Sequence, residues 1–236
     1  MKNIFIFAFF ICIFPILSVQ AEDKELTHED YLRLIDEYKN EPMPIIPDEH
    51  LFDGMKMYNK EDIKFSEEDL TAYDLNGNLI TGAVIMNPRV TKTFKNGKVD
   101  GPSLAKNEDY VMFANFIHEG GKYSLVALYQ EFLAGQLINE YKNNGKYFYG
   151  RRYDSSGRLI WDTINDNNMG IIIRAYDKKG NKTIEIDMFV PSVICFLKDG
   201  TQRDATPTEV ENFFAEQDKV VAQSYGEHEF NFSCQE

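Results

Sequence analysis

Tyr73-Asp-Leu-Asn-Gly77-Asn-Leu-Ile-Thr-Gly82 is the stretch that decides the fold of this 236-residue chain. An aromatic residue is followed by polar residues and a glycine, and an apolar run then begins at Leu79. Glycine readily adopts the positive φ that tight hairpin turns require, whereas other residues adopt it only at a cost. The stretch therefore predicts a hairpin turn at Gly77, with the ring of Tyr73 packed on the face of a sheet.

The same pattern recurs along the chain at intervals that indicate a repeat. Its glycines are spaced 20, 23, 25, 12, 23 and 20 residues apart, so five intervals lie near 22 and one is about half of that. A single hairpin cannot bury its own apolar side, and neighbouring hairpins would therefore share one face. An ordinary antiparallel sheet with frequent Asn-Gly turns is the alternative. The copies are Tyr73–Gly77, Phe94–Gly97, Phe116–Gly120, Tyr141–Gly145, Tyr153–Gly157, Tyr176–Gly180 and Phe196–Gly200.

The first two copies resemble the MORN-repeat variant family of bacteria, many members of which are labelled antitoxin components. Both the stretch quoted above and Phe94-Lys-Asn-Gly97-Lys-Val-Asp-Gly101 contain an aromatic residue, Asn-Gly, an apolar residue and a second glycine. The resemblance covers about residues 71–200 and is good in these two copies only. The later Tyr-Asp-x-x-Gly copies also resemble the tyrosine-aspartate repeats of large secreted shell proteins. The MORN resemblance implies a sheet of hairpins, with no enzymatic activity, cofactor or catalytic residues.

A short N-terminal helix is predicted over residues 27–39. Thr27 and Asp30 have the spacing of a capping box, and the apolar residues that follow recur at helical intervals. Three prolines within 42–47 then stop the helix and favour an extended strap that lies across another surface.

A C-terminal helix is predicted to begin after Thr206. Pro207 suits the first helical position, and Glu209 completes a second capping box. We expect this helix to cover an open end or one face of the sheet, which would shield edge strands from other chains. Residues 228–234 alternate apolar and polar side chains, as a final strand would.

Residues 1–21 have the features of a secretion signal. Lys2 precedes an apolar run at 4–17, and small side chains stand at Val19 and Ala21, where a signal peptidase reads the chain. The alternative is a membrane anchor, but a spanning helix needs roughly 20 apolar residues. We therefore expect a bacterial protein that is periplasmic or secreted, with no stable membrane span after cleavage.

The predicted fold class is mainly β: an antiparallel sheet of repeated hairpins, with a short N-terminal helix and a C-terminal helix. The predicted parts are the signal peptide at 1–21, the N-terminal helix and Pro-rich strap at 22–70, the hairpin sheet at 71–205, and the C-terminal helix and tail at 206–236.

Two cysteines, Cys195 and Cys234, remain after cleavage of the signal. An oxidising compartment favours a disulfide bond between them, and two buried free thiols are the alternative. Asn231 begins an Asn-Phe-Ser sequon and is a candidate glycosylation site.

The formal net charge of −13 makes nucleic acid an improbable partner, because an acidic surface repels phosphates. The simplest meaning of this charge is solubility, and the alternative is a cationic partner or bound divalent ions. The sequence contains no nucleophile elbow, phosphate loop or H-E-x-x-H motif. Carboxylate pairs such as Glu185 and Asp187 are expected by chance among 38 acidic residues. We predict no catalytic, cofactor-binding or metal-binding residues.

Aromatic residues gather between residues 147 and 161. Alternate residues of a strand face opposite sides, so some of these rings are expected on the side away from the main core. Exposed rings can stack on sugars or accept a partner protein, and the alternative is burial in the core or beneath the strap. This candidate binding patch comprises Tyr147, Phe148, Tyr149, Tyr153 and Trp161.

The predicted function is that of a non-enzymatic exported binding or scaffold protein. Its hairpin face would recognise a protein or glycan partner. Two alternatives remain open: an immunity-like protein that neutralises a toxin, and a hydrolase that acts on envelope glycans through paired carboxylates.

Overall fold

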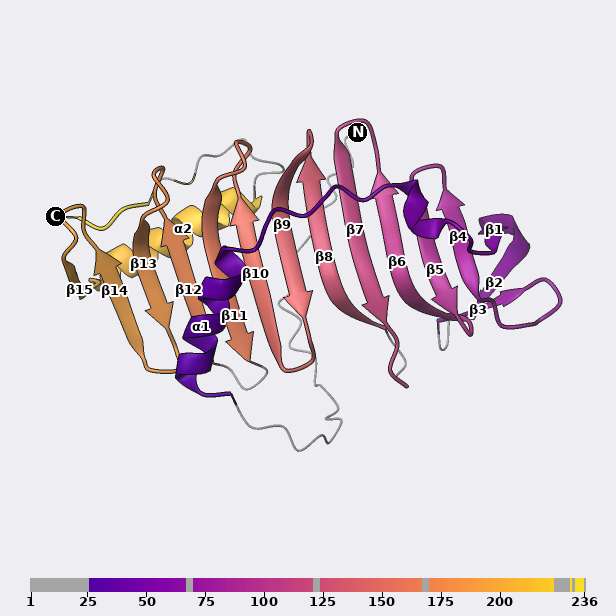
Figure 1. Ribbon diagram of the computed structural model, residues 1–236, viewed down its shortest axis with the longest axis horizontal. Coiled ribbons are helices and arrows are strands. Elements are labelled where there is room, and N and C mark those ends of the chain that lie inside the picture. Colours follow the sequence, from indigo (N-terminus) through magenta and orange to yellow (C-terminus); the bar gives the residue numbers. More distant parts are fainter. Residues whose placement is uncertain are drawn as a thin grey trace.

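A long sheet of thirteen hydrogen-bonded strands forms the body of the protein in the computed structural model (Figure 1). The structure describes residues 26–66, 70–120, 124–166, 170–222, 230 and 232–235. The predicted signal at 1–21 and the candidate glycosylation site Asn231 lie outside these residues. The mainly β fold with an N-terminal and a C-terminal helix is confirmed.

The strands of the long sheet follow one another as a meander, except that β1 pairs in parallel with β4 at one edge. A separate pair, β2 and β3, forms a two-stranded sheet. The strands are β1 Met57–Asn59, β2 Ile63–Ser66, β3 Thr71–Asp74, β4 Gly82–Asn87, β5 Val90–Lys95, β6 Lys98–Lys106, β7 Tyr110–Ile117, β8 Leu125–Leu133, β9 Gln136–Asn143, β10 Tyr147–Tyr153, β11 Leu159–Asp166, β12 Ile171–Tyr176, β13 Lys182–Asp187, β14 Ser192–Phe196 and β15 Gln202–Asp204. The helices are α1 His28–Lys39, the short 3-10 turns η1 Glu49–Phe52 and η2 Lys60–Asp62, and α2 Pro207–Ala222.

The glycine punctuation of the sequence is a property of the turns. All seven glycines of the repeat have φ between +65° and +87°. Those at 97, 120 and 145 follow β5, β7 and β9, whereas those at 157, 180 and 200 follow β10, β12 and β14. Because successive strands are antiparallel, the two sets of turns lie at opposite ends of the strands. The short interval of 12 residues, between Gly145 and Gly157, contains only the strand β10. The glycine turns before β10 are therefore at one end of the strands, and those after it are at the other end.

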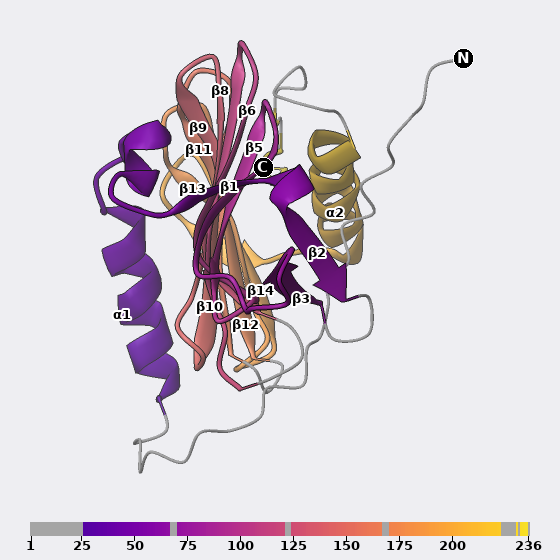
Figure 2. The same ribbon diagram turned by 90° about the vertical axis from the view of Figure 1, so that its right-hand side faces the viewer.

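The two long helices lie on opposite faces of the same half of the sheet. Figure 1 shows α1 in front of the strands around β11 and α2 behind them, and Figure 2 shows the sheet between the two helices. We name these faces the α1 face and the α2 face. The C-terminal helix therefore covers one face of the sheet. This was one of the two predicted positions, and the other was an open end of the sheet.

Both predicted capping boxes are present. The hydroxyl of Thr27 accepts from the backbone N–H of Asp30, whose carboxylate accepts from the N–H of Thr27. Thr206 and Glu209 make the corresponding pair at the start of α2. After α1 the strap crosses the α1 face to η1, as the proline content predicted (Figure 1).

The tail departs from its prediction. Its described residues, 230 and 232–235, form no strand. Instead Phe230 and Phe232 pack edge-on against Phe213 of α2, with ring centroids 6.2 and 5.5 Å from that of Phe213. The predicted strand is therefore absent from these residues, and residues 228, 229 and 231 of the prediction lie outside the described part of the chain.

Candidate functional site

A row of charged side chains crosses the α1 face in strand register. Each member pairs directly with the next across neighbouring strands, and the signs alternate. Opposite charges on directly paired residues stabilise a sheet. We name this set the charge row: Glu140 of β9, Arg151 of β10, Asp162 of β11, Arg174 of β12 and Glu185 of β13.

The charge row was not predicted from the sequence, although the spacing of its members is a signal for it. Its members are 11, 11, 12 and 11 residues apart. That spacing is half of the glycine period, because one strand and its turn occupy 11 or 12 residues. Acidic and basic residues that alternate at the strand period therefore indicate a cross-strand row.

The charge row docks the C-terminal end of α1. Arg151 donates to a carboxylate oxygen of Glu140 at 2.7 Å, and both side chains are 1% exposed. The same guanidinium donates to the backbone oxygens of Tyr38 and Glu41 at 3.0 and 3.2 Å. A cation at the C-terminal end of a helix donates hydrogen bonds to the last carbonyls, and it interacts favourably with the negative end of the helix dipole. Arg174 adds an ion pair of 2.6 Å to Asp36 of α1.

Asp162 is the titratable centre of the charge row. Its side chain is fully buried, and it accepts a hydrogen bond of 2.9 Å from the hydroxyl of Tyr176. Its other oxygen, Oδ1, has no hydrogen-bond partner among the described residues. Burial raises the pKa of Asp162 to about 7, although the positive charge of Arg174 opposes the shift. Since α1 covers this part of the sheet, the charge row serves to hold α1 and does not present its carboxylates to a ligand.

Replacement of Asp162 by asparagine is expected to flatten the dependence of stability on pH. The pKa of Asp162 rises from 3.8 to about 7 on folding, so between these values the folded state holds a proton that the unfolded state has lost. The contribution of Asp162 to the free energy of unfolding therefore decreases as the pH rises from about 4 to 7. Urea unfolding of both proteins at pH 5, 6, 7 and 8 measures the difference. An unchanged slope in the variant would contradict the assignment.

The predicted aromatic patch is divided between the two faces of the sheet. Tyr149 stacks on Tyr38 of α1 at 4.3 Å between ring centroids, and the hydroxyl of Tyr147 is 2.9 Å from that of Tyr38. Trp161 lies on the α2 face and packs on Phe230. Tyr147, Tyr149, Tyr153 and Trp161 are all buried, and only Phe148 is partly exposed. The alternative of burial therefore describes four of these five residues, and Phe148 is the one that is partly exposed. Their role in binding a partner stays a prediction.

Phe148 belongs instead to an aromatic strip on the α2 face. Tyr129 of β8, Tyr141 of β9 and Phe148 of β10 form this strip, and each is partly exposed. The centroids of Tyr129 and Tyr141 are 5.8 Å apart, and those of Tyr141 and Phe148 are 5.3 Å apart with planes inclined by 26°. Tyr141 lies against the backbone at Gly150, where an added Cβ would be 3.0 Å from the ring. Because Gly150 has no side chain, the ring of Tyr141 can lie close to the backbone of the sheet.

Polar groups flank the aromatic strip. Glu131 accepts hydrogen bonds from the hydroxyls of Tyr110 and Tyr129, both at 2.6 Å, and from the amide of Asn139 at 2.5 Å. Asn139 is paired across the strands with Arg152, whose Nε has no hydrogen-bond partner among the described residues. Rings, a carboxylate, an amide and a guanidinium are thus gathered on one surface. Sequence reasoning found only Phe148 of this set.

The strip lies between two covered regions of the α2 face. At one side α2 and the tail pack over Trp161 of β11 and its neighbours up to Cys195 of β14. At the other side the β2–β3 pair packs over Val84 and Phe94 of β4 and β5. Figure 1 shows β8 and β9 between these two covered parts of the sheet.

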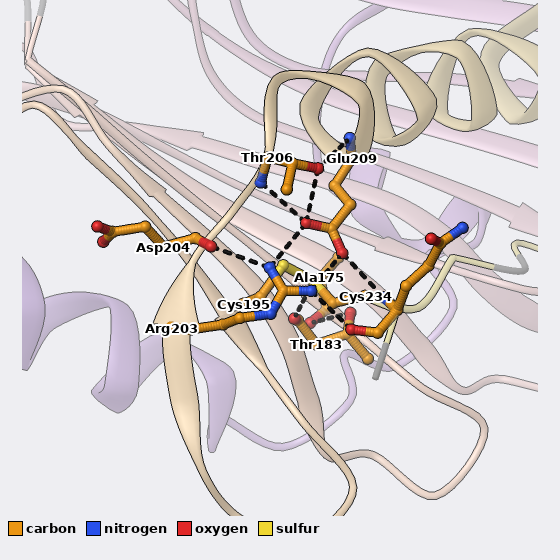
Figure 3. The surroundings of a disulfide bond; sticks show 9 residues. Ala175, Thr183, Cys195, Arg203, Asp204, Thr206, Glu209 and Cys234 are labelled. Carbon is orange, nitrogen blue, oxygen red and sulfur yellow. Dashed lines mark hydrogen bonds and ion pairs between the residues drawn. A yellow bond between two sulfur atoms is a disulfide. The ribbon is translucent and has the colours of Figure 1, made fainter.

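The structure brings the two predicted cysteines to disulfide-bonding distance. Cys195 of β14 and Cys234 of the tail have Cα atoms 5.8 Å apart (Figure 3). Beside them Arg203 donates to Glu209 and to the backbone oxygen of Gln235, and Glu209 accepts from the N–H of Gln235. The hydrogen bonds from Arg203 hold the pKa of Glu209 far below its usual range. The cysteine pair therefore holds the tail to β14, and the contacts of Gln235 with Arg203 and Glu209 hold it to the start of α2.

Cys195, Cys234 and Glu209 are also the one cluster with metal-ligand distances in the described part of the chain. With the two sulfurs bonded to each other, the cluster offers no thiolate to an ion.

Within the described residues, no helix combines the length and apolar character needed to cross a membrane. No protein-family model matches this chain, and no curated protein matches it either.

Proposed function

We propose that this protein is an exported, non-enzymatic binding protein that holds a glycan chain on the aromatic strip. The observation that carries this proposal is the contiguous run of three partly exposed rings on β8, β9 and β10 beside Glu131, Asn139 and Arg152. The features of a secretion signal and the cysteine pair at bonding distance support a periplasmic or secreted location.

The strip offers the two kinds of contact that a sugar requires. Aromatic faces pack on apolar C–H surfaces, and polar groups at the edge of the rings fix orientation. Tyr110 and Tyr129 donate their hydroxyl protons to Glu131, which fixes this carboxylate and both phenols in place beside the rings. Arg152 adds donors on the same face.

A globular protein partner fits this surface less well. A standard interface takes about 800 Å² from each partner, and its core is depleted of charged residues. Here a carboxylate and a guanidinium flank three rings, and covered regions lie on both sides. A narrow polymer can follow such a strip without displacing α2 or the β2–β3 pair.

Binding is favoured over hydrolysis by the carboxylates. Glycoside hydrolases use two carboxyl groups on opposite sides of the scissile bond. Among the described residues of the strip and its polar flank, Glu131 is the one carboxylate, and three donors already engage it. The carboxylates of the charge row lie on the other face.

The experiment is a panel of soluble cell-envelope glycans titrated into the mature protein by calorimetry. Tyr141→Ala and Phe148→Ala are each expected to weaken binding by about threefold to tenfold, because each removes one stacking surface. Phe65→Ala is the matched control, since Phe65 is a 42% exposed aromatic on β2 outside the strip.

Four results would count against the proposal. If no glycan of the panel binds, or if Phe65→Ala weakens binding as much as the strip variants, the strip is not a glycan site. If the strip variants abolish binding of one protein partner while glycans do not bind, the immunity-like alternative replaces it. Glycan cleavage that is lost in Glu131→Gln would favour the hydrolase.

A further inference from the structure

A cavity of about 420 Å³ lies between η1 and the first strands of the long sheet. Phe52 and Leu104 of its lining pack with Ala83 on the α1 face, so the sheet separates the cavity from the aromatic strip. Its size is within the range of small-molecule sites. Its apolar wall is made by Phe52, Met55, Met57, Ile85 and Leu104.

The apolar wall is open to solvent. Met57 and Ile85 are 46% and 38% exposed, although both are large apolar residues. Methionine side chains are flexible and polarizable, and they adapt to apolar ligands of irregular shape. Filling the cavity with an apolar chain would remove this surface from water at about 25 cal/mol per Å².

Two cations, Arg89 and Lys106, line the same cavity together with the carboxylates of Glu49 and Asp53. Lys106, at the end of β6, already forms an ion pair with Glu49. Arg89, in the turn between β4 and β5, has no carboxylate partner among the described residues. Its backbone is held in place, because its N–H donates to Asn87 at 2.8 Å and its carbonyl accepts from the N–H of Lys106 at 2.8 Å. Within the described part of the chain, Arg89 is therefore a positioned cation that pairs with no carboxylate, although the chain has 38 acidic and 25 basic residues.

We propose that this cavity binds the chain of a free fatty acid, with the carboxylate of the ligand at Arg89. The hydrocarbon would lie along Met57, Ile85 and Leu104, and the guanidinium of Arg89 would take the carboxylate through two parallel hydrogen bonds. The ligand thus supplies apolar cover for the exposed wall and a carboxylate for Arg89. This proposal is independent of glycan binding, since it uses the opposite face of the sheet.

The test is calorimetric titration of the mature protein with laurate below its micellar concentration. The comparison ligands are acetate, which has the head without the chain, and octaethylene glycol monododecyl ether, which has the chain with a neutral head. We expect saturable laurate binding at one site per chain, weaker binding of the neutral ligand, and no detectable binding of acetate.

Two variants separate the contributions of head and chain. Arg89→Gln, in an exposed turn, is expected to weaken laurate binding by about threefold to tenfold and to leave the neutral ligand unaffected. Met57→Asp is expected to weaken both by more than about tenfold, because it sets a charge against the chain. Arg33→Gln, an exposed arginine on α1, is the control for net charge.

The proposal is overturned if laurate does not saturate one site, or if laurate and the neutral ligand bind equally. It is also overturned if Arg89→Gln binds laurate as the unchanged protein does, or if Arg33→Gln weakens binding equally. Because Phe148→Ala changes only the aromatic strip, it should bind laurate normally. A failure of glycan binding and a failure of this cavity are therefore distinguishable.

Discussion

Replacement of Arg151 by methionine is expected to lower the free energy of unfolding by about 3–5 kcal/mol. The change leaves the carboxylate of Glu140, which is 1% exposed, without its charged partner. It also removes the two hydrogen bonds from the guanidinium to the backbone oxygens of Tyr38 and Glu41. Urea unfolding at pH 7 followed by circular dichroism measures the loss.

A double variant separates the two causes. Glu140→Leu combined with Arg151→Met removes both buried charges, and it is expected to be less destabilising than Arg151→Met alone. Arg33→Met is the matched control, because Arg33 is exposed on α1 and its ion pair with Glu37 is at the surface. It should change stability by less than about 1 kcal/mol. If the double variant is as unstable as the single one, an unpaired charge is not the cause.

Replacement of both Cys195 and Cys234 by alanine is expected to lower the free energy of unfolding by about 4 kcal/mol. The two residues are separated by 39 positions, and release of a loop of this length increases the entropy of the unfolded chain. The tail would then be held to α2 by its packing and by the Arg203–Glu209 contacts alone. Urea unfolding of the variant and of the unchanged protein under oxidising conditions gives the difference.

The reduced protein provides the control for this prediction. The unchanged protein in excess dithiothreitol should unfold at nearly the same urea concentration as the double alanine variant. Thiol titration of the denatured oxidised protein should find no free thiol. Two titrating thiols per chain would show that the cysteines are not bonded to each other in the purified protein.

These two predictions address helices that are attached to the sheet by different interactions. A cationic side chain beneath α1 satisfies its last carbonyls, and ion pairs complete its docking. By contrast, α2 packs on the aromatic rings of the tail, and the cysteine link ties that tail to β14. We therefore expect docking of α1 to respond mainly to pH, through Asp162, and docking of the tail on α2 to respond mainly to redox conditions.

Local chemistry allowed much of the fold to be predicted from the sequence. A glycine after an aromatic and several polar residues predicted a turn, and all seven such glycines have positive φ. The capping residues predicted where α1 and α2 begin, and both starts are confirmed. The resemblance to the MORN-repeat variant family stays a prediction. Such features depend on neighbours within a few residues, so the sequence alone contains the information.

The candidate site was much less predictable. Some of the five rings close in sequence were expected to be exposed, but the sequence did not indicate which. Tyr149 is covered by Tyr38, and the two residues are more than 100 positions apart. The strip and the charge row each join residues of three or more strands, and strand register decides those neighbours. The 11-residue recurrence of opposite charges was the one sequence signal for such a row.

By itself, the sequence determined the turns, the helix starts and the cysteine pair. Only the tertiary structure decided which sheet face each helix covers, and therefore which aromatic side chains are exposed. The physical reason is that turn and cap energies arise between residues close along the chain. Burial of a sheet face depends on segments that fold back from far along the chain and dock there.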